Sequence, residues 1–166
     1  GLALRMLGRG HRIGVVQFIK GAWHSAERDA LARFGDQVAW HTMGEGFTWE
    51  TQDRARDVAA AECAWAKARE LMADPGFALV VLDELNIALR YDYLQIGEVV
   101  ASLAARRSDL TVVVTGRNAK PELIAARIRE IKDQGVVVAG SLTPQKVTDY
   151  IDVALDAGLD ILVIQG

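Results

Sequence analysis

The sequence predicts an α/β fold with three layers and a mostly parallel sheet of about six strands. Two observations support this prediction. Short apolar segments alternate with helical segments along almost the whole chain, and the apolar segments are continuous rather than alternating with polar residues. Continuous apolar strands are typical of parallel sheets, because helices cover both faces of such sheets. We expect a single domain over residues 1–166, since no Gly-, Ser- or Pro-rich linker interrupts the pattern.

The expected elements follow from apolar spacing and from residues that end helices. Strands are expected over residues 12–19, 37–42, 77–82, 110–115, 136–139 and 160–164. Helices are expected over residues 2–7, 26–34, 51–72, 96–103, 121–134 and 144–157. The long third helix should bury a single stripe, made of Ala61, Ala64, Trp65, Ala68, Leu71 and Met72. Thr143 and Pro144 are suited to begin the last helix as its N-cap and first helical residue.

Composition excludes several classes of function. The 166 residues are 51% hydrophobic and 25% charged, with a net charge of −3, which gives no general attraction to nucleic acid or anionic membranes. No apolar run is long enough to span a membrane, and the first residues do not resemble a secretory signal. The single cysteine excludes an internal disulfide, and the three histidines lack metal-ligand spacing. We therefore expect a cytoplasmic protein that needs no cofactor for folding.

Asp83 and Glu84 form the first candidate site. They directly follow the apolar residues 79–82, at the carboxyl end of an expected buried strand. In α/β folds this end of the sheet is where ligands bind, and two carboxylates there suit a magnesium ion that bridges phosphates. The alternative is that Asp83 caps a helix while Glu84 is solvated. We favour the magnesium site, because the change from apolar to acidic residues is abrupt.

Other candidate ligand-binding residues lie on expected loops. Phe47 and Trp49 occupy a glycine-flanked loop, where exposed aromatic side chains can cover a ligand or can instead cap the edge of the core. The residues alone do not decide between these two roles. Lys20 and Arg117 each follow a strand and could meet phosphate groups, although an isolated surface cation is more often simply solvated.

Residues 1–125 resemble the ATP:corrinoid adenosyltransferases. The motifs that carry the resemblance are VVQFIKG at 15–21, GFTW at 46–49, LDEL at 82–85 and TGRN at 115–118. The resemblance implies a P-loop NTPase-like, Rossmann-like fold that binds Mg-ATP and a reduced corrinoid, whose cobalt attacks the adenosyl 5′-carbon. It also implies that Phe47 and Trp49 bind the corrinoid, that Lys20 and Arg117 bind nucleotide or phosphate, and that Asp83 and Glu84 bind magnesium. The family tends to dimerise, so a homodimer is one possible assembly.

The phosphate-binding glycine loop of that family is not found in the sequence. No Gly-x-x-x-x-Gly-Lys-Ser/Thr motif occurs, and the family's loop would stand before Gly1. Without that loop ATP would lose several charge-assisted contacts, each worth roughly 1.5–3 kcal/mol. ATP, magnesium and corrinoid are therefore expected to bind only if the parental site survives.

Residues 126–166 resemble a different family, the barrel proteins related to inosine monophosphate dehydrogenase. The motifs LTPQ at 142–145 and AGLDILVIQG at 157–166 carry this second resemblance, which covers one strand–helix–strand unit. It implies that a βαβ unit of TIM-barrel origin completes the sheet. A further hypothesis is that the strand at 161–164 takes the place of the family's first strand, which would accompany the glycine loop before Gly1. The main interpretation is then a recombined or engineered scaffold, in two parts at 1–125 and 126–166, without catalytic turnover. The alternatives are a corrinoid adenosyltransferase and a module that retains weak nucleotide or corrinoid binding.

Overall fold

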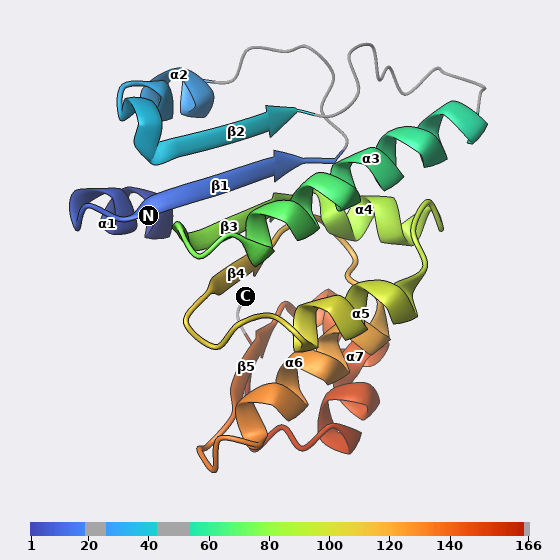
Figure 1. The fold of residues 1–166 in the computed structure, drawn as a ribbon. Helices are drawn as coiled ribbons and strands as arrows, with labels where there is room; N and C mark the ends of the chain where they lie inside the picture. Colours follow the sequence, from blue (N-terminus) through green and yellow to red (C-terminus); the bar gives the residue numbers. More distant parts are fainter. Residues whose placement is uncertain (19–25, 43–53, 165–166) are drawn as a thin grey trace. The chain divides into compact units, whose positions relative to one another are not determined.

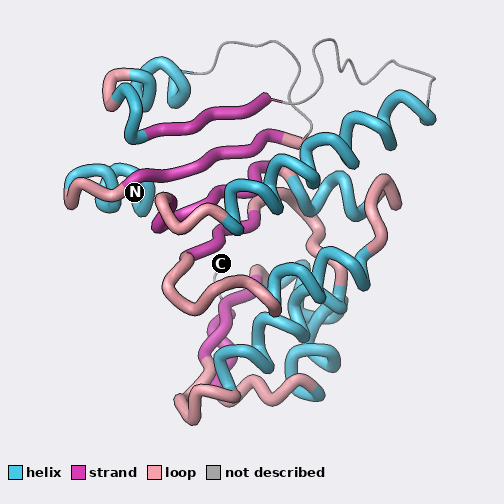
Figure 2. Tube along the Cα trace, in the orientation of Figure 1, coloured by secondary structure: helices cyan, strands magenta, loops and turns pink. Residues whose placement is uncertain are grey.

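The computed structural model describes residues 1–18, 26–42 and 54–164, which form two compact units. We call residues 1–118 the N-terminal unit and residues 119–166 the C-terminal unit. In the described part of the chain, four strands form a sheet in the first unit and two strands form a separate sheet in the second (Figures 1 and 2). The predicted mixed α/β class and strand number are therefore present, whereas the predicted single continuous sheet is wrong.

The sheet of the N-terminal unit is parallel throughout. Its strands are β1 (Arg12–Gln17), β2 (Val38–Thr42), β3 (Phe77–Asp83) and β4 (Thr111–Val114), in the spatial order β2-β1-β3-β4. The two central strands are the most deeply buried, because each has a neighbour on both edges. All four strands end at the same edge of the sheet, so residues that follow them come together there.

Helices cover both faces of this sheet. The helices of the unit are α1 (Leu2–Gly8), α2 (Ala26–Ala32), α3 (Arg54–Ala73), α4 (Leu85–Arg90) and α5 (Ile96–Ala104), with a short 3-10 turn at Gly35–Gln37. On one face, Ile13, Val15 and Leu79 form a core with Leu7 of α1 and Leu31 of α2. The three-layer arrangement predicted for this part of the chain is thus present.

The long helix α3 packs on the opposite face, where Figure 1 shows it running across β1 and β3. A Cβ at Gly14 of β1 would lie only 3.0 Å from Cδ1 of Leu71, so glycine allows this close approach. The predicted stripe of α3 is confirmed, since all of its members are buried: Ala61, Ala64, Trp65, Ala68, Leu71 and Met72. Small alanine side chains at helical spacing let the helix lie close to the sheet.

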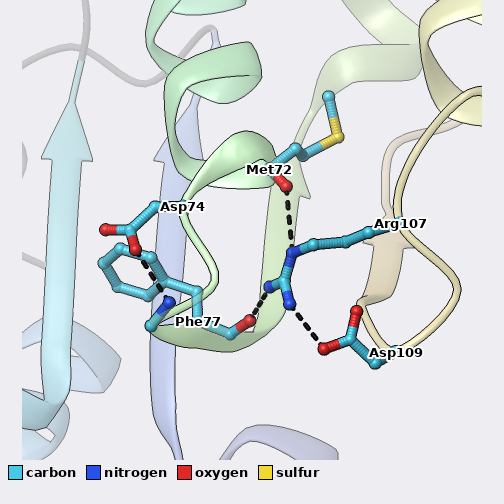
Figure 3. Close-up of polar contacts among 6 residues, drawn as sticks. Met72, Asp74, Phe77, Arg107 and Asp109 are labelled. Atoms are coloured by element: carbon cyan, nitrogen blue, oxygen red, sulfur yellow. Dashed lines mark hydrogen bonds and ion pairs between the residues drawn. The ribbon is translucent and has the colours of Figure 1, made fainter.

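Arg107 joins three segments at the amino-terminal edge of the sheet (Figure 3). Its Nε donates a hydrogen bond to the carbonyl of Met72 at the end of α3, at 3.4 Å. Its guanidinium also donates to the carbonyl of Phe77 at the start of β3, and it pairs with Asp109 at 2.8 Å. A planar guanidinium can serve several acceptors at once. The contacts therefore fix the connection before β4 against the turn that leads into β3.

The C-terminal unit consists of α6 (Pro121–Lys132), β5 (Ala139–Leu142), α7 (Pro144–Asp156) and β6 (Ile161–Ile164). The two strands are parallel and are joined by α7. Thr143 and Pro144 begin α7 as predicted, although the Thr143 side chain makes no capping hydrogen bond. The core of the unit is small and consists of Ala125, Ile128, Val138, Ala154, Ala157 and Leu159.

Two predictions for this unit are wrong. The strand expected at 136–139 begins only at Ala139, because the carbonyl of Val138 accepts hydrogen bonds from the amides of Asp160 and Ile161, and pairing with β6 starts after it. Val136 and Val137 precede the strand and are 52% and 68% exposed. The strand at 161–164 does not complete the first sheet, because β6 pairs with β5, its neighbour in sequence.

Candidate functional site

Asp83 lies at the carboxyl end of β3, where the side chains of two neighbouring segments bind it. Nε2 of Gln17, the last residue of β1, donates to Oδ2 of Asp83 at 3.0 Å. The hydroxyl of Thr115, directly after β4, donates to Oδ1 at 2.8 Å. The register places Gln17 opposite Asp83, which explains why their side chains meet. Counting only described residues, each carboxylate oxygen thus has one fixed donor and a lone pair that another ligand can use.

Gln17 is held in turn by residues of β2. Its Oε1 accepts hydrogen bonds from Nε1 of Trp40 at 3.2 Å and from the hydroxyl of Thr42 at 3.1 Å. Nε1 of Trp40 also approaches the Thr42 hydroxyl at 3.2 Å. Gln17 is only 5% exposed, so water competes little for these groups. The network spans three adjacent strands and ends on Asp83.

Glu84 follows in a strained backbone position. Its φ is +63°, an uncommon value for a residue other than glycine, and its N–H donates to the Thr115 hydroxyl at 3.0 Å. Its Oε2 is buried and has no hydrogen-bond partner among the residues that the structure describes. A Cβ at Gly116, whose φ is +117°, would lie 3.3 Å from that oxygen and 2.9 Å from Cβ of Asn86. Glycine at position 116 therefore leaves the space in which the Glu84 carboxylate lies.

Asn86 adds a second buried acceptor close by. It is 6% exposed, and its Nδ2 donates to the carbonyl of Gly116 at 3.1 Å. Its Oδ1 is buried and, like Oε2 of Glu84, has no partner in the described part of the chain. Buried acceptors are normally paired, so two unpaired acceptors at one place indicate room for a donor or a cation. This chemistry fits magnesium, which prefers oxygen ligands.

The described part of the chain brings only some of the predicted site residues together. Asp83 and Glu84 are adjacent at the strand end, and Arg117 lies exposed two residues beyond Thr115. Lys20, Phe47 and Trp49 lie outside the described residues. The alternative role for Asp83 as a helix cap is not observed, because Glu84 occupies the N-cap position of α4 and makes no side-chain capping bond.

Sequence reasoning missed Gln17, Thr115 and Asn86. Gln17 interrupts the apolar and glycine residues of the strand expected at 12–19, and a polar residue inside such a run is a usable signal. No group of three or more His, Cys, Asp or Glu side chains capable of holding a metal occurs among the residues that the structure describes. Water and bound phosphates commonly supply further ligands to a magnesium ion that is held by one or two carboxylates. No described helix is long and apolar enough to cross a membrane.

Comparison with known proteins points to one family. The sequence model of the ATP:corrinoid adenosyltransferases BtuR/CobO/CobP matches residues 1–134. A corrinoid adenosyltransferase of Pseudomonas aeruginosa is 56% identical over 126 residues, which cover 76% of this chain and 62% of that protein. One from Sinorhizobium is 55% identical over 126 residues, covering 75% of this chain and 59% of the relative. The chain thus spans less than two thirds of the length of these two relatives.

A third relative extends the similarity further along the chain. Corrinoid adenosyltransferase CobA of Salmonella typhimurium is 44% identical over 152 residues, which cover 90% of this chain and 76% of that protein. The predicted change of family at residues 125–126 falls inside both this alignment and the family match to residue 134. Neither comparison supports a barrel-derived segment or a chimera.

Proposed function

Because the chain belongs to the ATP:corrinoid adenosyltransferase family, we propose that it transfers the 5′-deoxyadenosyl group of ATP to the cobalt of a corrinoid. In this reaction a cobalt–carbon bond forms and the bond between the 5′-carbon and its oxygen breaks. Triphosphate leaves with the electron pair of the broken bond. The protein must therefore bind a highly charged phosphate chain next to a flat, largely apolar macrocycle.

The arrangement around Asp83 is the observation that carries this proposal. Asp83 and Glu84 would hold magnesium, which supplies positive charge to the triphosphate when bound. Gln17 and Thr115 fix the Asp83 carboxylate by hydrogen bonds of 3.0 and 2.8 Å. The position at the carboxyl ends of parallel strands is where nucleotide-binding α/β folds place their ligands.

The other predicted residues have roles that follow from their chemistry. Arg117 is exposed just beyond β4 and can pair with phosphate oxygens. We propose that Lys20 contributes in the same way, and that Phe47 and Trp49 contact the corrinoid. These aromatic side chains suit the macrocycle, because large flat apolar surfaces bind well to aromatic rings.

A module that binds nucleotide or corrinoid without turnover is the second candidate. It rests on the same carboxylates, Asp83 and Glu84, which can bind a cation and phosphate groups whether or not turnover follows. The recombined scaffold is a third candidate, but the continuous sheet expected of it is not found among the described residues, and the comparisons do not support it. The family match beyond residue 125 favours the transferase over both.

The test is an adenosylation assay with chemically reduced corrinoid and Mg-ATP. The loss of the cobalt(I) absorbance measures the rate. Asp83→Asn should lower kcat/KM by at least about 100-fold, because it removes the fixed negative charge that would hold the cation. Asp109→Asn is the matched control, since Asp109 pairs with Arg107 at the other edge of the sheet. No turnover with measurable Mg-ATP binding would favour the binding module. If the protein shows neither turnover nor Mg-ATP binding, the result would favour the scaffold.

A further inference from the structure

The hydrogen bonds that lead to Asp83 have a fixed direction. An indole N–H can only donate, so the atom of Gln17 that faces Trp40 must be its oxygen. The amide nitrogen of Gln17 is then directed to Asp83 and can only donate. The hydroxyl of Thr42 donates to the same oxygen of Gln17 and so supports this orientation.

Thr115 imposes the same direction on the other oxygen of Asp83. The Thr115 hydroxyl accepts the N–H of Glu84 at 3.0 Å, which leaves its own hydrogen for Asp83. Both oxygens of Asp83 therefore accept, and the network is satisfied by the carboxylate form. Both donors are neutral, so the network orients the negative charge without neutralising it.

We propose that Gln17 is a positioning residue that holds Asp83 for a divalent cation, as an oriented carboxylate whose charge is not compensated by any residue that the structure describes. Trp40 and Thr42 keep the Gln17 amide in the donating orientation. This inference rests on the proposed function, in which Asp83 and Glu84 hold the cation. It assigns a purpose to a polar residue on the buried strand β1 and to two residues with polar groups on the half-buried edge strand β2.

The chemistry at position 17 is specific to glutamine. Methionine has a similar length but would leave Oδ2 of Asp83 and Nε1 of Trp40 without Gln17 as a partner. Glutamate would direct a second carboxylate at Asp83 and introduce repulsion between like charges. Substitution of a residue that hydrogen-bonds to a metal ligand typically lowers metal affinity by about 10–100-fold.

The experiment measures the binding of Mn²⁺ alone, through the loss of the electron paramagnetic resonance signal of free aqueous Mn²⁺. Gln17→Met should weaken Mn²⁺ binding by about 10-fold or more. Thr42→Val should weaken it by a smaller factor, since Trp40 still orients the amide, and this variant serves if Gln17→Met does not fold. Tyr93→Phe is the control, because it removes a part-buried hydrogen bond to Asp57 elsewhere in the same unit.

The adenosylation assay separates this inference from the proposed function. In Gln17→Met the Mg²⁺ concentration for half-maximal rate should rise about 10-fold, with a smaller change in kcat at saturating Mg²⁺. Mn²⁺ binding that depends on Gln17 in a protein without turnover would overturn the proposed function and support the inference. Equal Mn²⁺ binding by wild type and Gln17→Met, or no Mn²⁺ binding by the wild type, would overturn the inference.

Discussion

The two units contain strands of similar composition but bury them to different extents. In β3 of the N-terminal unit, Leu79 and Leu82 are fully buried. In β6 of the C-terminal unit, Ile161 and Ile164 are 50% and 57% exposed. The difference arises because β3 lies between two strands and under α3, whereas β6 has β5 as its neighbour in a two-stranded sheet. An apolar run thus predicts a strand, but the number of surrounding elements decides its burial.

Each unit also places an aspartate next to a strand, with opposite electrostatic surroundings. Asp83 is the last residue of β3 and accepts hydrogen bonds from two neutral side chains. Asp160 precedes β6 and accepts from the Lys132 ammonium and from the backbone N–H of Val138. The charge of Asp160 is therefore compensated within the unit, as in a structural ion pair. The charge of Asp83 is oriented without such a partner in the described part of the chain, as a ligand site requires.

The largest expected effect is on the free energy of unfolding, when leucine is replaced by alanine in each of the two units. Leu79→Ala should lower the free energy of unfolding by about 2–5 kcal/mol, because it leaves a cavity in a fully enclosed core. Leu155→Ala on α7, where the side chain is 55% exposed, should change it by less than about 0.5 kcal/mol. Urea denaturation followed by circular dichroism measures both. Equal losses in the two variants would show that Leu155 is covered in solution and would remove the contrast.

A second comparison concerns two glycines with positive φ. Gly116→Ala should lower the free energy of unfolding by about 2–3 kcal/mol, because the added Cβ meets Asn86 at 2.9 Å in an already strained backbone conformation. Gly135→Ala should lower it by only about 1 kcal/mol, since φ is +69° but the surrounding space is open. Thermal or urea unfolding distinguishes the two. A smaller loss in Gly116→Ala than in Gly135→Ala would contradict the packing around Glu84.

Much of the N-terminal unit could be predicted from its sequence. The strands at 12–17 and 77–83 have apolar runs that only a covered parallel sheet explains, and the buried stripe of α3 follows from helical spacing. The position of Asp83 and Glu84 at the end of β3 could also be predicted, because the change from apolar to acidic residues marks the carboxyl end of the strand, while their role as magnesium ligands stays a prediction. These signals are local, so they can be read without knowing the tertiary pairing.

The remaining features depend on pairing that the sequence does not display. The role of Gln17 requires the register between β1 and β3, and that of Thr115 requires β4 to lie beside β3. The short helix α4 was not predicted, because Glu84 reverses the backbone with a positive φ immediately before it. The wrong assignment of β6 to the first sheet has the same origin, since apolar composition does not identify a strand's partner.

The third prediction compares Arg107, which makes part-buried hydrogen bonds to backbone carbonyls, with an exposed arginine of the C-terminal unit. Arg107→Met should lower the free energy of unfolding by about 1–2 kcal/mol, because the carbonyls of Met72 and Phe77 lose a charged donor. Arg127→Met on α6 is the matched change in the C-terminal unit, where the side chain is 62% exposed and pairs with Glu130. It should change stability by less than about 0.5 kcal/mol. Equal stability of Arg107→Met and wild type would show that water replaces the guanidinium without loss.

The smallest expected effect concerns the pH dependence of the C-terminal unit. The hydrogen bond from Lys132 and then that from the Val138 amide lower the pKa of Asp160 below its ordinary value of 3.8. Because the folded-state pKa is the lower one, the stability contributed by Asp160 is fully present above the unfolded-state pKa. It is lost as the pH falls through the folded-state pKa. The effect should be small, since the carboxylate is exposed and water screens it.

The chemical shift of the Val138 amide, followed by NMR during acid titration, reports this proton directly. Its midpoint should lie below 3.8 in the wild type and should rise toward that value in Lys132→Met, which removes the strongest cause of the shift. Asp160→Asn should abolish the transition. A wild-type midpoint at or above 3.8 would show that Lys132 does not compensate Asp160. The electrostatic contrast between the ion-paired aspartate of the C-terminal unit and Asp83 would then rest on the hydrogen-bond donors of Asp83 alone.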